Sequence, residues 1–278
     1  MNWHKWLIIP AFSVLVACTS STQEGTIGIQ RKQLLLLPSS QVDAMALQSY
    51  RGELSTAKQK GTLNTDKANL ERIRKIADRL IPQVAVFRRD ALDWSWEVNL
   101  ETRNELNAYC ASGGKIMFFT GIINQLKLSD DEIAAIMGHE MAHALREHGR
   151  ERISQAYAQQ AGMSLLALVT NMSQNEAAIV QTATNLALTL PHGRGQESEA
   201  DVMGLELLAR AGYNPNASVS LWQKMGAANK NAPPAFLSTH PSSAQRINEL
   251  NSKISTVMPL YEAAKRNTSS VKMIVPRI

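Results

Sequence analysis

Apolar side chains recur with helical spacing over much of the first third of this chain. Residues 42–58 show the pattern, and residues 66–81 show it more clearly, with Ile73, Ile76 and Leu80 three and four positions apart. Side chains at that spacing lie on one face of a helix. Both segments are therefore predicted to be helices that pack against a core.

Two later stretches have the composition of strands. These are Trp94–Leu100 and Lys115–Thr120, and the second follows the turn signal Ser112-Gly113-Gly114. A short sheet is expected here. The most apolar later segment, Ala161–Thr170, soon meets polar residues and is shorter than the ~18 residues of a membrane span. We interpret it as a soluble helix near the functional site, with shallow insertion into a membrane as the alternative.

The N-terminus has the layout of an export signal. Lys5 precedes a mainly apolar run, Leu7–Val16, and the tetrapeptide LVAC resembles the bacterial lipobox, so residues 1–17 are predicted to be a lipoprotein signal peptide. Cys18 would then carry the lipid anchor; the alternative is a plain signal peptide with an incidental cysteine. Thr19 stands where an Asp would favour the inner membrane, so we expect anchoring at the periplasmic face of the outer membrane.

Composition narrows the class of protein. The chain has 278 residues, of which 44% are hydrophobic, so it can bury a core. We divide it into a polar tether at 18–40, a domain at 41–255 and a C-terminal tail at 256–278. The net charge of +5 is modest, and basic and acidic residues mix in runs such as Arg146–Arg152, which is typical of a solvated helical face and argues against nucleic-acid binding.

The chain has two cysteines. If Cys18 is acylated, Cys110 has no partner for an internal disulfide. We therefore expect Cys110 to be a small buried thiol, and stability to come from packing and metal binding.

The strongest chemical signal is the stretch GHEMAHALREH at residues 138–148. Ser129 with Glu132 forms a capping box that starts a helix upstream. At about 100° per residue, His139 and His143 lie within ~40° of each other on one helix face, so both imidazoles can bind one metal ion. Glu140 is placed to reach a water on that metal as general base.

A third histidine does not fit this face. His148 is five residues past His143, or roughly 140° around the helix, and is expected at the surface or the helix end. Gly149 occupies the position of the third histidine in metzincins and excludes that class.

A second motif supplies carboxylates. Glu197 and Asp201 are four residues apart in a segment that continues as an amphipathic helix, so they share a face. One suits a third metal ligand, and the other suits the acceptor for the free N–H of a ligating histidine. Glu199 should face away from both. The alternative is an acidic helix start favoured by the helix dipole.

Together, HEMAH and the later E-x-x-A-D resemble the HtpX and CAAX prenyl endopeptidase family of zinc metallopeptidases. The likeness extends over about residues 40–255 and includes Asn107-Ala108, Gly113-Gly114, Gly121 and the stretch Ser238-Thr239-His240-Pro241 followed by Arg246. Ser112 departs from the proline usual in related sequences. The chain is most similar to the short lipoprotein members of the bacterial envelope.

The resemblance implies a gluzincin fold of the α+β class, mostly helical with a small mixed sheet. It implies one Zn²⁺ per chain bound by His139, His143 and Glu197, with Glu140 as catalytic base and Asp201 supporting a ligand. It further implies cleavage of internal peptide bonds in misfolded or misassembled envelope proteins. Other divalent ions also suit two imidazoles and a carboxylate.

His240 keeps three interpretations: stabilisation of an oxyanion, a fourth zinc ligand that holds the enzyme latent, or a cap for a helix that begins near Ser242. His192 is expected to be exposed. An extended substrate is expected to add to an edge strand near Lys115–Thr120. The rival function is a lipid-anchored, zinc-stabilised chaperone or assembly factor with little or latent proteolysis; the oligomeric state stays open.

Overall fold

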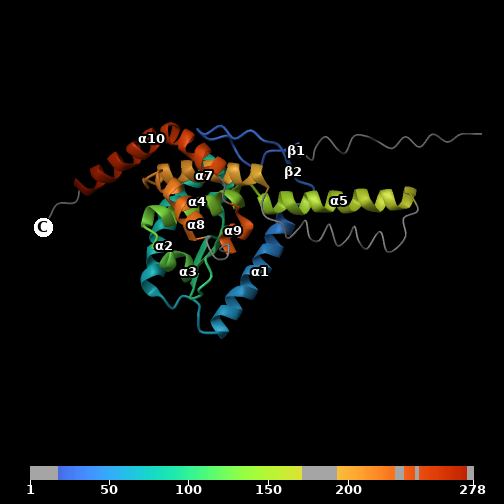
Figure 1. Cartoon of the computed structure of the whole chain (residues 1–278), viewed down its shortest axis with the longest axis horizontal. Coiled ribbons are helices and arrows are strands. Elements are labelled where there is room, and N and C mark those ends of the chain that lie inside the picture. Colours follow the sequence, from blue (N-terminus) through green and yellow to red (C-terminus); the bar gives the residue numbers. More distant parts are fainter. Residues whose placement is uncertain (1–17, 171–192, 229–234, 242–243, 274–278) are drawn as a thin grey trace, which may run out of the picture.

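A computed structural model describes residues 18–170, 193–228, 235–241 and 244–273 of the chain (Figure 1). The expected signal peptide and His192 lie outside these residues. The described part is mostly helical and contains one small mixed sheet, as predicted.

Several of the helices pack around α4 (Asp130–Leu145). The described helices are α1 (Ser39–Gln59), α2 (Lys67–Leu80), α3 (Thr120–Gln125), α4 (Asp130–Leu145), α5 (His148–Thr170), α7 (Arg194–Arg210), α8 (Ala217–Ala228), α9 (Ala235–Thr239) and α10 (Ala244–Met273), with 3₁₀ turns η2 (Ile81–Val86) and η3 (Arg89–Asp93). The two helices predicted at 42–58 and 66–81 are α1 and α2. In α2, the side chain of Asp66 accepts the Asn69 N–H, and the predicted apolar face is buried.

The sheet has three strands: β3 (Glu97–Glu101), β4 (Ala108–Ala111) and β5 (Lys115–Phe119). Their order is β3-β5-β4, with β5 parallel to β3 and antiparallel to β4. The expectation that Lys115–Thr120 forms an edge strand is therefore wrong. All residues of β5 are buried between two partners, and β4 has the outer edge near the candidate site.

Helix α4 passes through the core. Ser129 and Glu132 form the predicted capping box, since the Ser129 hydroxyl accepts the Glu132 N–H and the Glu132 carboxylate accepts the Ser129 N–H. Helix α7 crosses α4 where Gly138 meets Gly204. A Cβ added at Gly204 would lie 2.8 Å from the backbone nitrogen of His139. Two glycines at this crossing let the helices that carry the candidate ligands approach at backbone distance.

The segment expected to be a tether lies against the domain. Strand β1 (Cys18–Thr19) pairs with β2 (Gln33–Leu34), and Ile27 and Ile29 join the main core. Glu206 of α7 accepts the backbone N–H groups of Thr26 and Ile27 at 3.1 and 2.9 Å. We call residues 18–37 the N-terminal strap; they are packed rather than free in solvent.

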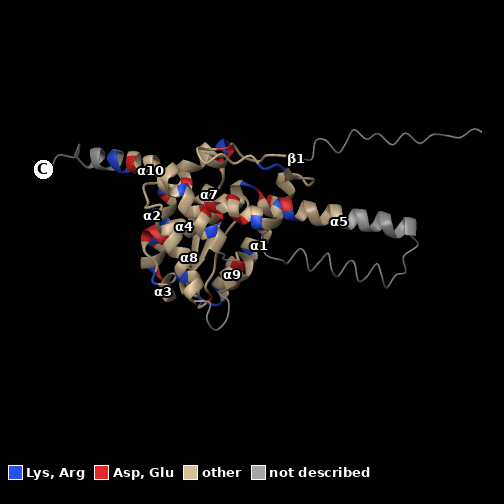
Figure 2. Cartoon of the chain, turned by 45° about the horizontal axis from the view of Figure 1, so that its top comes forward, with Lys and Arg blue, Asp and Glu red and all other residues tan. Residues whose placement is uncertain are grey.

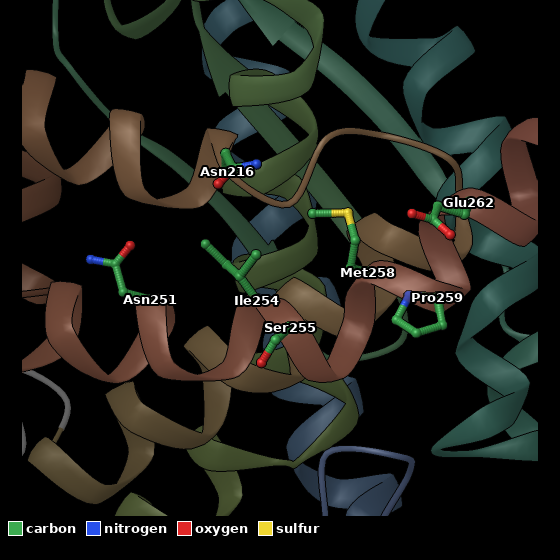
Figure 3. A pocket seen from close by; sticks show the side chains of 7 residues that line it. All are labelled: Asn216, Asn251, Ile254, Ser255, Met258, Pro259 and Glu262. Atoms are coloured by element: carbon green, nitrogen blue, oxygen red, sulfur yellow. The ribbon is translucent and has the colours of Figure 1, made fainter.

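Helices α5 and α10 both extend outward from the body (Figure 1). Helix α5 includes the apolar segment 161–170, which is helical as predicted, and α10 continues into the region expected to be a tail. A shallow hollow lies between α10 and the start of α8, lined by residues such as Asn216, Ile254 and Met258 (Figure 3). It contains none of the candidate site residues. Among the described residues, no helix combines the length and apolar character needed to span a membrane.

Candidate metal centre

The predicted metal ligands meet between α4 and α7. The Nε2 atoms of His139 and His143 are 3.1 Å apart, as expected for histidines one turn apart on α4. Glu197, in the first turn of α7, places Oε1 3.3 Å from His143 Nε2 and Oε2 3.6 Å from His139 Nε2. All three side chains are buried.

His240 completes this group. It follows α9, and its Nδ1 lies 3.3 Å from His139 Nε2 and 2.9 Å from Glu197 Oε1. Phe236 stacks on its ring at a centroid distance of 4.5 Å. His240 therefore belongs to the cluster and is not at the surface. The interpretation of His240 as a helix cap involved Ser242, and residues 242–243 lie outside the described residues.

The donor set fits a tetrahedral zinc ion. Donor atoms of His139, His143, Glu197 and His240 all lie within 4.8 Å of one another. Zinc bonds to imidazole nitrogen of about 2.0–2.1 Å give ligand-to-ligand edges of ~3.4 Å, close to the separations between these donors. Burying two imidazoles and a carboxylate with their lone pairs converging is costly without a cation between them. The residues present therefore suit Zn²⁺.

Glu140 lies beside this cluster, on the side of the sheet. Its Oε1 is 3.4 Å from His240 Nε2 and, among the described residues, has no hydrogen-bond partner although it is buried. Burial raises the pKa of Glu140, and the neighbouring His240 and His139 act in the opposite direction. A raised pKa suits a carboxylate that must take up and release a proton.

A cleft of about 450 Å³ opens from Glu140 and His240. Its lining includes the whole of β4 with Asn107 and Ser112, the start of α5 and part of α1. Cys110 is buried there as the expected free thiol, and burial raises its pKa. The cleft thus joins the general-base candidate to an open strand edge.

Asp201 lies beside His139, where the sequence placed it. Its Oδ1 lies 3.1 Å from His139 Nδ1, the nitrogen that faces away from the cluster. Arg246 donates to both carboxylate oxygens of Asp201, at 2.6 and 2.7 Å, contacts Glu197 Oε2 at 2.6 Å, and stacks on Trp222. Burial acts to raise the pKa of Asp201, but the charge and hydrogen bonds of Arg246, together with His139, outweigh it and lower that pKa. Sequence reasoning noted Arg246 without giving it a role.

The expectation that His148 is at the surface is wrong, although it does stand at a helix end, the start of α5. It is fully buried, and its Nδ1 lies 2.8 Å from Nδ1 of His143. The angular argument assumed one continuous helix, but α4 ends at Leu145 and Glu147 has a positive φ of 50°. This left-handed residue redirects the chain, and His148 begins α5 facing back toward the site.

The charged run around His148 is buried or half-buried rather than solvated. Figure 2 shows acidic and basic positions gathered where α5 begins. Of the residues in this run, Arg146 and Glu151 are almost fully buried. Glu199, which does face away from the ligands, accepts hydrogen bonds from Arg146 and Arg31 at 2.7 Å each and lies 3.1 Å from His148 Nε2. Burial acts to raise the pKa of Glu199, but these partners lower it to about 2.

The structure thus brings six predicted residues together and places one elsewhere. The assembled residues are His139, Glu140, His143, Glu197, Asp201 and His240. Cys18 lies in β1, at the start of the strap.

Comparison with known proteins places the chain in a family. The model of peptidase family M48 matches residues 67–254, more than half of the chain and every residue of the assembled cluster. The chain belongs to peptidase family M48. This confirms the metallopeptidase family and the gluzincin-type fold expected from the sequence.

The M48 domain also aligns with named relatives. It is 40% identical over 152 residues to the mitochondrial metalloendopeptidase OMA1 of Arabidopsis thaliana, covering 55% of this chain and 30% of that protein. It is 32% identical over 187 residues to OMA1 of Saccharomyces cerevisiae, covering 65% of this chain and 53% of that protein. It is 29% identical over 164 residues to a putative beta-barrel assembly-enhancing protease of Vibrio cholerae, covering 56% of this chain and 34% of that protein. The matched region thus spans between 30% and 53% of the length of these relatives.

Proposed function

We propose that this M48 protein is a zinc-dependent endopeptidase. The observation that carries the proposal is the buried donor cluster of His139, His143 and Glu197 with the Glu140 carboxylate beside it. The relatives named as metalloendopeptidases support the reaction class.

Bound zinc would supply a Lewis acid that polarises the scissile carbonyl. It would also lower the pKa of water, which can then lose a proton and attack that carbonyl. In this mechanism Glu140 takes a proton from the attacking water on its Oε1 and delivers it to the leaving amine. Its raised pKa, caused by burial, strengthens the carboxylate as the acceptor of that proton. Asp201 Oδ1, 3.1 Å from His139 Nδ1, is placed to accept the Nδ1–H and so to keep Nε2 of that ring available to the metal.

The substrate in this proposal is an extended peptide that adds to the outer edge of β4. That edge lines the cleft and leads to Glu140, and in the three-stranded sheet β4 pairs only with β5. Recognition by main-chain hydrogen bonds favours unfolded segments over particular side chains. Cleavage of an unfolded protein with its folded form spared is the expected result; equal rates on both forms would contradict it.

For the cellular setting we propose a lipid anchor at Cys18 on the periplasmic face of the outer membrane. The lipobox-like LVAC supports the anchor, and the bacterial relatives named beta-barrel assembly-enhancing proteases support misfolded or misassembled envelope proteins as substrates. Radiolabelled palmitate incorporation that is lost in Cys18→Ser would support the anchor. Incorporation unchanged by that substitution would reject it.

The test of catalysis is Glu140→Gln. This variant should retain fold and zinc, because the carboxylate is outside the ligand set, while kcat on an unfolded casein falls roughly 10²–10⁴-fold. Zinc content measured on the same sample separates loss of catalysis from loss of metal. Normal turnover in this variant would reject the mechanism.

A second function is a zinc-stabilised chaperone or assembly factor whose proteolysis is latent. The position of His240 favours it, because Nδ1 of that residue lies among the ligand donors, where it would occupy the fourth zinc position. Under latency, His240→Ala increases casein hydrolysis. If His240 instead stabilises the reaction, the same substitution decreases it.

A further inference from the structure

We propose that His148 and Glu199 are positioning residues for the metal centre, which hold His143 in the tautomer whose Nε2 is free to bind the cation. This inference rests on the proposed zinc site. It assigns a role to a histidine that lies outside the ligand set and to the acidic residue between Glu197 and Asp201.

The proton positions follow from the geometry. His143 directs Nε2 at the other ligand donors, so a neutral ring bound to metal carries its proton on Nδ1. That N–H points at Nδ1 of His148, 2.8 Å away, which must therefore accept. His148 then carries its proton on Nε2, 3.1 Å from Glu199 Oε2.

Glu199 is what selects this tautomer of His148. A carboxylate accepts hydrogen bonds and does not donate, so it requires the N–H of His148 to be on Nε2. Arg146 and Arg31 each donate to Glu199 and keep it ionised and in place. With the tautomer of His148 fixed, the lone pair on its Nδ1 is directed at His143.

The chain of contacts ends in the N-terminal strap. Arg31 bridges Glu199 and Glu151, while Gln33 donates to the backbone carbonyl of Arg146 at 2.5 Å. Arg146 in turn donates to Ser20 at 2.8 Å. His143, His148 and Glu199, the members of this series nearest the candidate metal site, are buried. Each of their hydrogen bonds therefore lies in a medium where losing a partner is costly.

The test compares substitutions that differ in the hydrogen-bond acceptor they leave for the Nδ1–H of His143. His148→Leu removes the acceptor. His148→Asn keeps a carbonyl oxygen near the former Nδ1 position but does not reach Glu199. Glu199→Gln keeps the shape of that side chain and removes its charge, so an amide is free to donate and to favour the wrong tautomer.

The measured quantities are the zinc dissociation constant, from competition with a chromophoric chelator, and the visible absorption spectrum of the Co²⁺-substituted protein. Zinc binding should weaken ~10–100-fold in His148→Leu, less in His148→Asn and least in Glu199→Gln. The cobalt bands of His148→Leu should shift or lose intensity, because the orientation of one ligand changes.

Glu206→Gln is the matched control. Glu206 is buried on α7 and holds the strap through Thr26 and Ile27, yet it does not contact His148 in the described structure. This variant should lower the melting temperature of the zinc-free protein and leave zinc affinity unchanged. If it weakens zinc binding as much as His148→Leu does, the effect is general destabilisation and positioning is rejected.

Wild-type affinity and an unchanged cobalt spectrum in His148→Leu would overturn the proposal. If that variant does not fold, the same result in both His148→Asn and Glu199→Gln overturns it. Failure of the wild-type protein to bind one zinc ion would instead reject the proposed function. The two failures are therefore distinguishable.

Discussion

The two histidines of α4 stand one turn apart but are supported in different ways. His139 reaches a carboxylate directly, with Nδ1 3.1 Å from Asp201. His143 reaches one through a second imidazole, because His148 lies between it and Glu199. The first support is short and is backed by Arg246 from α10. The second is longer and continues into the N-terminal strap.

Both supports nevertheless begin on α7. Asp201 and Glu199 are two residues apart, so they leave opposite sides of that helix and enclose the ligand pair between them. Glu197 belongs to the same helix and is itself a candidate ligand. The register of α7 against α4 therefore fixes one ligand and both supporting carboxylates at once.

Gly204→Ala should disturb both supports together and give the largest effect. The new Cβ would lie 2.8 Å from the backbone nitrogen of His139, and rigid backbone cannot yield as a side chain can. We expect the free energy of unfolding to fall by about 2–3 kcal/mol, together with weaker zinc binding. Urea unfolding of zinc-free protein and chelator competition measure the two quantities.

Gly226→Ala provides the control for that substitution. Gly226 lies in α8, and a Cβ there meets no atom within 4 Å. Replacing an exposed helical glycine should leave stability unchanged or raise it by about 0.5–1 kcal/mol. Equal behaviour of the two alanine variants would show that the glycine crossing does not set the register of α7.

The direct support was predictable from the sequence and the relayed one was not. Asp201 follows Glu197 by four residues, and helical spacing alone places both on one face. The orientation of His148 depends on the end of α4 at Leu145 and on the positive φ of Glu147. Neither can be read from the spacing of apolar residues. Positive φ at a glutamate is unusual, so helical extrapolation past residue 145 gave the wrong direction for His148.

The same distinction applies to the fold. Spacing and capping predicted α1, α2, α4 and two of the three strands, because those signals are local. The order of strands is a long-range property, and β5 lies in the centre although its sequence was interpreted as an edge. The strap was interpreted as a tether because its residues are mostly polar. Those residues have buried partners far along the chain, as Arg31 has in Glu151, and local sequence does not reveal them.

Asp201→Asn should break the direct support alone. The amide can still accept from His139, but it loses the charge that polarises the imidazole and its strong contact with Arg246. We expect zinc affinity to fall about tenfold, and further than in Glu199→Gln, because no second imidazole separates Asp201 from the ligand. Chelator competition on both variants tests this order; a larger effect from Glu199→Gln would reverse the ranking of the two supports.

Arg31→Met tests the far end of the relayed support and should give the smallest effect. The guanidinium contacts Glu151 at 2.5 Å and Glu199 at 2.7 Å, but its side chain is 36% exposed. An ion pair that water partly screens contributes about 1 kcal/mol. The free energy of unfolding at pH 7 should fall by that amount, while Lys32→Met, at the exposed neighbouring position, should leave it unchanged.

The loss caused by Arg31→Met should depend on pH. Burial acts to raise the pKa of Glu151, but hydrogen bonds from Arg31, Gln196 and Gln33 and the charge of Arg31 together outweigh it and lower that pKa below 4.5. A carboxyl group whose pKa is lower in the folded state stabilises the fold above its unfolded pKa and loses that contribution as pH falls toward its folded pKa. Urea unfolding of the zinc-free proteins should therefore show the full difference between wild type and Arg31→Met at pH 7 and a shrinking one below about pH 4.5. A difference that stays constant down to pH 3.5 would mean that Arg31 acts through packing of its aliphatic stem, and the relayed support would then end at Glu199 rather than in the strap.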